Sequence, residues 1–170
     1  HLSSMHVSHV IVGHSERRAY LQETDIMIRD KTAAVLADGM HAVLCVGEKV
    51  RVNNELSRIV EQQLANALKG ISSNINKLVI AYEPVWAIST MPGARPDTPK
   101  NARMVKEQIR VSMVKQFGTT GKQIRIIYGG SVRPDNIRAY LTEGGMEGAL
   151  VGGASLNPKT FDALVKNAVL

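Results

Sequence analysis

The sequence has one cysteine, few aromatic residues and no long apolar run, and each of these scarcities excludes a class of protein. Cys45 alone cannot build a disulfide framework or a cysteine-based metal cluster, and it is expected to be a small buried apolar residue. Aromatic residues make up 4% of the chain, too few for a base-stacking surface. No apolar run approaches the ~20 residues that cross a bilayer. Neither a membrane nor a nucleic acid is therefore expected as a partner, and a cytoplasmic location is expected.

The charge and the histidines narrow the chemistry further. Lysine and arginine exceed the acidic residues by six, but they are dispersed along the chain, which favours a small anionic ligand over a polyanion. His1, His6, His9 and His41 show no recurrent spacing with acidic residues, so neither a metal nor a cofactor is expected.

Residues 1–170 are long enough for one domain with a core, and strand-like and helix-like segments alternate along them. Asp25 begins a periodic segment that ends at Gly39, and Asn53 begins another that runs towards Gly70. Thr98 and Asn157 each precede a proline and are predicted helix N-caps. Five short apolar runs predict buried strands at residues 10–12, 43–46, 78–81, 124–127 and 149–151. This alternation predicts a parallel α/β fold, either an open doubly wound sheet or a closed barrel.

Functional residue types and glycines follow the predicted strands directly. They form the motifs Gly13-His14-Ser15-Glu16, Gly47-Glu48, Tyr82-Glu83-Pro84, Gly129-Gly130-Ser131 and Gly152-Gly153. Because the carboxyl ends of parallel strands meet at one edge, these residues are expected to share a site.

Two glycine-containing motifs after the last two predicted strands predict a phosphate site, since glycine lets main-chain N–H groups approach an anion. The alternative is that these glycines serve tight turns with positive φ. Glu83 is the candidate general base, although a structural ion pair would also explain it. His14 is either a hydrogen-bonding electrophile or scaffolding. Together these residues suit proton abstraction beside a carbonyl.

The same motifs resemble those of the triosephosphate isomerase family in content, order and spacing. The segment Val10-Ile11-Val12-Gly13-His14-Ser15-Glu16-Arg17-Arg18 resembles its electrophile segment, and Ala81-Tyr82-Glu83-Pro84-Val85-Trp86-Ala87-Ile88 its base and lid segment. Cys45-Val46-Gly47-Glu48, Tyr128-Gly129-Gly130-Ser131-Val132 and the segment from Gly148 to Leu156 provide three further matches. The resemblance covers essentially the whole chain.

The resemblance implies a partial (β/α)8 TIM barrel in one domain, containing the fourth to eighth βα units. It implies interconversion of dihydroxyacetone phosphate and glyceraldehyde 3-phosphate in glycolysis and gluconeogenesis, without a cofactor, through an enediolate. It also implies a homodimer. The implied catalytic residues are Glu83 as base, His14 as electrophile and Glu16 in support; the implied phosphate ligands are Ser89, Ser131, Gly152 and Gly153; the implied lid contains Pro84, Val85, Trp86, Ala87, Ile88, Thr90 and Met91.

Two departures from the family pattern qualify this expectation. Ser89 and Met91 stand where the family has glycines, which predicts strain if either position needs a positive φ, and Pro92 is expected to stiffen the hinge. The family's first three strands and its substrate-site lysine would lie upstream of His1. We therefore expect either a longer enzyme of which this is a portion, or a fragment that pairs with itself or with a separate N-terminal piece. A catalytically silent partial barrel that retains phosphate binding is the alternative.

Overall fold

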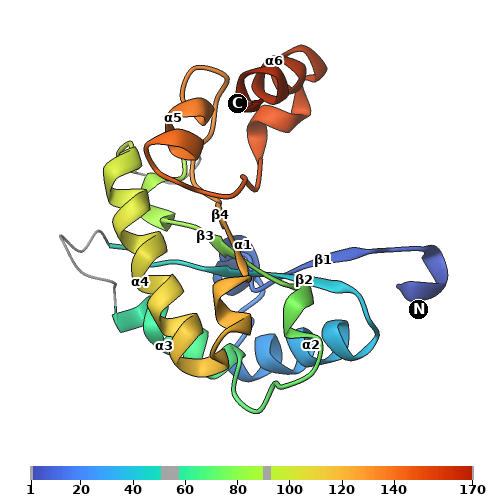
Figure 1. Ribbon diagram of the computed structural model, residues 1–170. Coiled ribbons are helices and arrows are strands. Elements are labelled where there is room, and N and C mark those ends of the chain that lie inside the picture. The colour runs from blue at the N-terminus through green and yellow to red at the C-terminus, as the bar shows by residue number, and fades with distance from the viewer. Residues whose placement is uncertain (1, 51–57, 90–92, 170) are drawn as a thin grey trace.

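A parallel four-stranded sheet lies at the centre of the computed structural model, which describes residues 2–50, 58–89 and 93–169 (Figure 1). The strands are β1 (His9–Val12), β2 (His41–Val46), β3 (Leu78–Tyr82) and β4 (Arg125–Tyr128), and they are arranged in chain order. Parallel neighbours in chain order require a crossover after each strand, and helices provide these crossovers. The parallel α/β prediction is confirmed.

The two faces of the sheet are covered to different extents because side chains alternate along each strand. Leu44, Ile80 and Ile126 lie on the face that packs against the helices and have no exposed surface. The opposite face carries a small cluster around Cys45 and Ala81, and on β1 this face leaves Ile11 half exposed. In a closed barrel this second face would be the interior, so the described strands form an open part of such a barrel.

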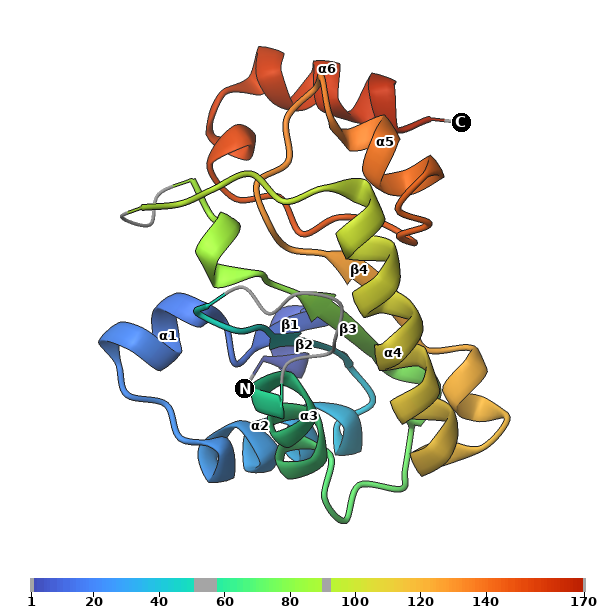
Figure 2. The same ribbon diagram turned by 90° about the vertical axis from the view of Figure 1, so that its left-hand side faces the viewer.

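Helices cover the first face and extend beyond β4. The longer ones are α2 (Asp25–Ala37), α3 (Arg58–Ala67), α4 (Pro99–Phe117) and α6 (Pro158–Ala168). Figure 2 shows α2 and α3 below the sheet, α4 beside it, and α5 (Ile137–Thr142) with α6 at the other end. Short 3-10 turns occur at Ser3–Met5, Ile75–Lys77, Val85–Ala87, Thr120–Lys122 and Gly153–Leu156. None of the described helices has the length and apolarity that a membrane crossing requires.

The predicted helix starts at Thr98 and Asn157 are confirmed by their capping bonds. The Thr98 hydroxyl accepts from the Asn101 N–H, and the Asn157 side chain accepts from the next two N–H groups of α6. The segment that begins at Asp25 is also helical, with Thr24 as its cap. The predicted start at Asn53 lies outside the described residues.

The end of the sheet differs from the prediction. Residues 149–151 do not form a strand; a single parallel bridge joins Ala149 to Tyr128 instead. The prediction of a buried strand here is wrong, because a strand needs a longer hydrogen-bonded ladder than this segment makes, and its residues are only partly buried. The short helices α1 (Ser15–Tyr20) and α5 were not predicted, because six residues are too few to show a helical period.

Helix α4 provides a matched test of this core. Ile109 is fully buried on α4, whereas Val111 on the same helix is 67% exposed. Ile109→Ala is expected to lower the free energy of unfolding by about 2–5 kcal/mol, because it removes transfer energy and leaves a cavity. Val111→Ala should change it by less than about 0.5 kcal/mol. Urea unfolding followed by circular dichroism measures both, and similar losses would contradict the packing described here.

Candidate active site

One pocket of about 490 Å³ at the carboxyl edge of the sheet brings the predicted site residues together. This volume is within the range of small-molecule sites. Its lining includes the predicted catalytic residues His14, Glu16 and Glu83 and the predicted phosphate ligands Ser89, Ser131, Gly152 and Gly153. Ile88 of the predicted lid also lines it. The roles of these residues remain predictions, but their proximity is a property of the fold.

Glu83 stands at the floor of this pocket, directly after β3. Its backbone N–H donates to Val46 O, which continues the pairing of β3 with β2. One carboxylate oxygen lies 2.9 Å from His14 Nε2, and the other accepts from the Ser15 backbone N–H at 3.0 Å. Only 2% of the residue is exposed. The carboxylate is therefore held by two donors from the segment after β1.

Glu83 fits between two glycines, Gly47 and Gly129, whose lack of side chains makes room for it. A Cβ at Gly47 would lie 1.7 Å from Glu83 O, and a Cβ at Gly129 would lie 2.8 Å from Glu83 Cγ. Real Cβ contacts do not approach this closely, so both neighbouring strands need glycine where they pass Glu83. Gly47 follows a predicted strand, but the sequence alone did not indicate this role.

His14 is oriented by its own helix and by Glu83. It is the N-cap of α1, where its Nδ1 accepts from the Glu16 N–H at 3.4 Å. With Nδ1 as acceptor, Nε2 carries the hydrogen that points at Glu83. The hydrogen bond to Glu83 raises the pKa of His14 above its ordinary value, and partial burial opposes this effect without cancelling it. Nearby charge on Glu83 and Glu16 adds to the increase.

Glu16 lies at the mouth of the pocket with most of its side chain in solvent. Its side chain is 61% exposed, and its Oε2 lies 4.0 Å from His14 Nδ1. Within the described ranges, no lysine or arginine forms an ion pair with Glu16. Arg133 is the one lysine or arginine among the described lining residues, and it pairs with Asp135 at 3.0 Å. The sequence analysis did not identify Arg133.

The proposed phosphate ligands approach the pocket from three loops. The Ser89 N–H donates to Ser131 Oγ at 2.8 Å, which joins the loop after β3 to the loop after β4. Gly152 and Gly153 are exposed, and a Cβ at either would contact nothing within 4 Å. Both therefore leave open space beside the pocket.

Backbone angles exclude one of the two explanations offered for the glycine-containing motifs, the tight turn with positive φ. None of Gly129, Gly130, Gly152 and Gly153 has a positive φ, so a left-handed turn explains none of them. Close packing explains the first two, since a Cβ at Gly130 would lie 2.4 Å from the Tyr128 hydroxyl. Ser89 also lacks a positive φ, so the strain considered there is absent.

The segment after Glu83 is anchored beside the pocket by a buried carboxylate. Val85–Ala87 form a 3-10 turn that begins at Pro84, and Trp86 Nε1 donates to Glu48 Oε1 at 2.6 Å. The Tyr82 hydroxyl donates to the same oxygen at 2.9 Å. Burial raises the pKa of Glu48, although both hydrogen bonds lower it. Thr90, Met91 and Pro92 lie outside the described residues.

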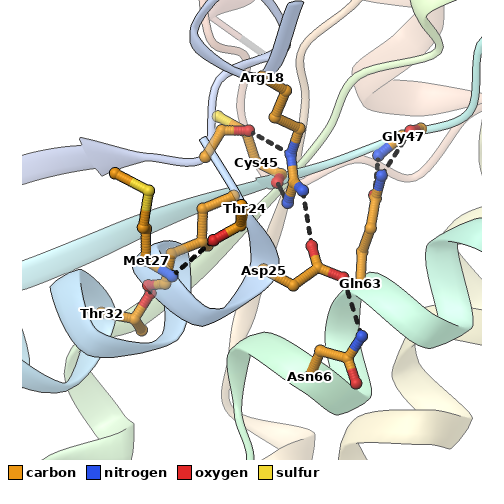
Figure 3. A network of polar contacts seen from close by, with 11 residues as sticks. Arg18, Thr24, Asp25, Met27, Thr32, Cys45, Gly47, Gln63 and Asn66 are labelled. Carbon is orange, nitrogen blue, oxygen red and sulfur yellow. Dashed lines mark hydrogen bonds and ion pairs between the residues drawn. The ribbon is translucent and has the colours of Figure 1, made fainter. Parts of the chain in front are cut away.

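Polar contacts also hold the segment after β1 and helix α3 against β2. Arg18 donates to Gly13 O at 2.8 Å and to Cys45 O at 3.4 Å. It also pairs with Asp25 at 2.8 Å, and Figure 3 shows Arg18 beside Asp25 and Cys45. Gln63 of α3 exchanges two hydrogen bonds with the Gly47 backbone. Cys45 itself is fully buried, as predicted. In the part of the chain that the structure describes, no cluster of three potential metal ligands occurs.

Comparison with known proteins identifies the family. The family model described as triosephosphate isomerase matches residues 1–168. The chain belongs to the triosephosphate isomerase family.

Three relatives named triosephosphate isomerase illustrate how closely and how completely the chain matches this family. The protein of Caldanaerobacter subterraneus subsp. tengcongensis is 43% identical over 96% of this chain and 66% of its own length. That of Carboxydothermus hydrogenoformans is 43% identical over 99% and 67%, respectively. That of Endomicrobium trichonymphae is 44% identical over 94% and 64%. The chain thus spans about two thirds of the length of these relatives, in agreement with a partial barrel.

Gly47 offers a test of the space around Glu83. Gly47→Ala is expected to lower the free energy of unfolding by about 1–3 kcal/mol or more, because the new Cβ overlaps the Glu83 carbonyl. Gly153→Ala is the matched control, since its Cβ enters open space and Gly153 lies in the 3-10 turn Gly153–Leu156 without a positive φ. Denaturant unfolding compares the two variants. Equal stability would show that the backbone around Glu83 adjusts freely.

The contact between His14 and Glu83 predicts a pH dependence. Because the pKa of His14 is raised in the folded state, the contact stabilises the fold below the ordinary histidine pKa, and this contribution is lost as the pH rises through the raised value. NMR titration should give a midpoint for His14 above 6.5, and Glu83→Gln should lower it. His14→Asn assigns the signal. A midpoint that Glu83→Gln leaves unchanged would contradict this assignment of cause.

Proposed function

We propose that this protein is a triosephosphate isomerase, which interconverts dihydroxyacetone phosphate and glyceraldehyde 3-phosphate. The observation that supports the proposal most directly is the contact of Glu83 with His14 in a pocket also lined by Ser89, Ser131, Gly152 and Gly153. A buried carboxylate, an imidazole N–H and groups suited to an anion then meet in a space that fits a phosphorylated triose. The names of the relatives agree with this substrate.

In the proposed mechanism, Glu83 removes a proton from the carbon beside the substrate carbonyl and returns it to the neighbouring carbon. His14 Nε2–H donates to the carbonyl oxygen and stabilises the enediolate while negative charge develops on it. The proton of the neighbouring substrate hydroxyl moves to the former carbonyl oxygen, so that the hydroxyl oxygen becomes the new carbonyl. Glu83 contacts His14 and the Ser15 N–H, so in this mechanism the carboxylate exchanges these partners for substrate. Glu16 supports His14 from the other side of the ring.

Phosphate binding positions the triose for this transfer. Main-chain groups of Ser89, Ser131, Gly152 and Gly153 hold the phosphate, and the Ser89 N–H exchanges Ser131 Oγ for it. Arg133, paired with Asp135, lines the same pocket. The segment from Pro84 onward excludes water from the enediolate. The mechanism uses no cofactor and no metal.

The wider assignment follows from this activity. We propose one domain over residues 1–170, a place in glycolysis and gluconeogenesis, a cytoplasmic location, and either a homodimer or pairing with an N-terminal segment. The incomplete cover of the inner sheet face, where Ile11 is half exposed, supports an additional covering chain.

A catalytically silent partial barrel that binds phosphate is the second candidate. It is favoured by Glu16, for which the described residues provide no lysine or arginine partner. In this candidate the pocket would retain its anion ligands but lack the fixed positive charge expected beside the substrate.

Turnover of the protein as its gene encodes it distinguishes the two candidates. Glu83→Gln is expected to reduce kcat by about 10²–10⁴-fold, because the amide cannot act as a base. Glu107→Gln, at an exposed position on α4, is the matched control and should retain activity. A coupled assay measures the rate in each direction. Wild-type protein that binds phosphate without turnover would support the silent barrel, and unchanged turnover in Glu83→Gln would refute the role of Glu83.

A further inference from the structure

Asp97 is a buried carboxylate outside the reacting centre, and only 8% of it is exposed. It directly precedes Thr98, the N-cap of α4. Its Oδ1 accepts from the Thr98 N–H at 2.7 Å and from Asn101 Nδ2 at 2.8 Å. These two contacts are local to the start of α4, and they use one of the two carboxylate oxygens.

The other oxygen of Asp97 reaches the end of β4. The Tyr128 hydroxyl donates to Asp97 Oδ2 at 3.2 Å, and the Tyr140 hydroxyl donates to Asp97 O at 2.8 Å. The two tyrosine rings stack with centroids 4.0 Å apart. Burying a carboxylate is costly unless donors satisfy it, so these hydrogen bonds hold Asp97 in one place.

Tyr128 connects this carboxylate to the proposed phosphate loop. It directly precedes Gly129-Gly130-Ser131, and its hydroxyl end lies against Gly130, where an added Cβ would come within 2.4 Å. The position of the ring therefore constrains the backbone that leads to Ser131. An interaction that fixes the Tyr128 hydroxyl also fixes this loop.

Asp97 also ends the segment that carries the other proposed phosphate ligand. The Arg95 N–H donates to Trp86 O at 3.0 Å, so the chain before Asp97 pairs with the chain after Glu83. Ser89 then donates to Ser131 Oγ at 2.8 Å. Two separate links thus join the loop after β3 to the loop after β4, one through Asp97 and one through Ser131.

We propose that Asp97 is a positioning residue for phosphate binding, which holds the Gly129-Gly130-Ser131 loop in place through the hydroxyl of Tyr128. The inference rests on the proposed function, since it assigns these loops to the substrate phosphate. Asp97 does not contact the reacting atoms. Its loss therefore weakens phosphate binding more than it slows proton transfer.

Two variants break the link from opposite ends. Asp97→Ala removes the acceptor of the Tyr128 hydroxyl, together with the side-chain contacts to Thr98 and Asn101. Tyr128→Phe removes the hydroxyl, with its contact to the Tyr140 hydroxyl at 3.3 Å, while it keeps the stacked ring. Each is expected to weaken binding of inorganic phosphate, measured by calorimetry, by about three- to ten-fold. KM for the triose phosphate should rise by the same factor, with kcat changed less than about two-fold. The double variant should be no weaker than the weaker single variant, because both remove one link.

Asp30→Ala and Tyr20→Phe are the matched controls, since both residues are exposed and lie outside the pocket. If one test variant fails to fold, the other decides. Unchanged phosphate affinity and KM in a folded test variant would overturn the inference, as would additive losses in the double variant. Wild-type protein that binds inorganic phosphate but does not isomerise the triose phosphate would refute the proposed function. The phosphate affinities of the variants would still decide the role of Asp97. Wild-type protein that does not bind phosphate would overturn both.

Discussion

The site depends on the close packing of Glu83 between two strands that carry glycine at the points of contact. Gly47 and Gly129 let β2 and the end of β4 approach Glu83 so closely that any side chain there would overlap it. Two backbone hydrogen bonds, from the Glu83 N–H to Val46 O and from the Gly129 N–H to Tyr82 O, then fix the position of Glu83 at the edge of the sheet. Without this arrangement the carboxylate would not meet the groups that follow β1.

The electrostatics of the pocket follow from that placement. A carboxylate as buried as that of Glu83 needs hydrogen-bond donors, and His14 Nε2 and the Ser15 N–H provide them. The same contact raises the pKa of His14, so each of the two groups stabilises the other. In the proposed mechanism substrate replaces this contact, which connects the stability of the site to its chemistry.

The loops around the pocket are joined by polar side chains rather than by sheet pairing. Glu48 holds Trp86, Ser131 holds Ser89, and Asp97 holds Tyr128. Each of these bonds connects residues that are more than 30 positions apart in the chain. Such bonds allow loops after different strands to act as one surface, which a single loop cannot provide.

The sequence by itself determined the parallel α/β alternation and the capped helix starts at Thr98 and Asn157. It also determined that His14, Glu83 and the glycine-containing motifs meet at the carboxyl edge of the sheet. Local periodicity and capping chemistry are sufficient for the first two features, because each depends on residues close together in the chain. The third follows from the first, since parallel strands bring their carboxyl ends to one edge. Only the tertiary structure decided that residues 149–151 form a single bridge, that Gly47 and Gly129 make room for Glu83, and that Asp97 meets Tyr128. These depend on distances between strands and loops that are far apart in sequence, and no local pattern specifies such distances.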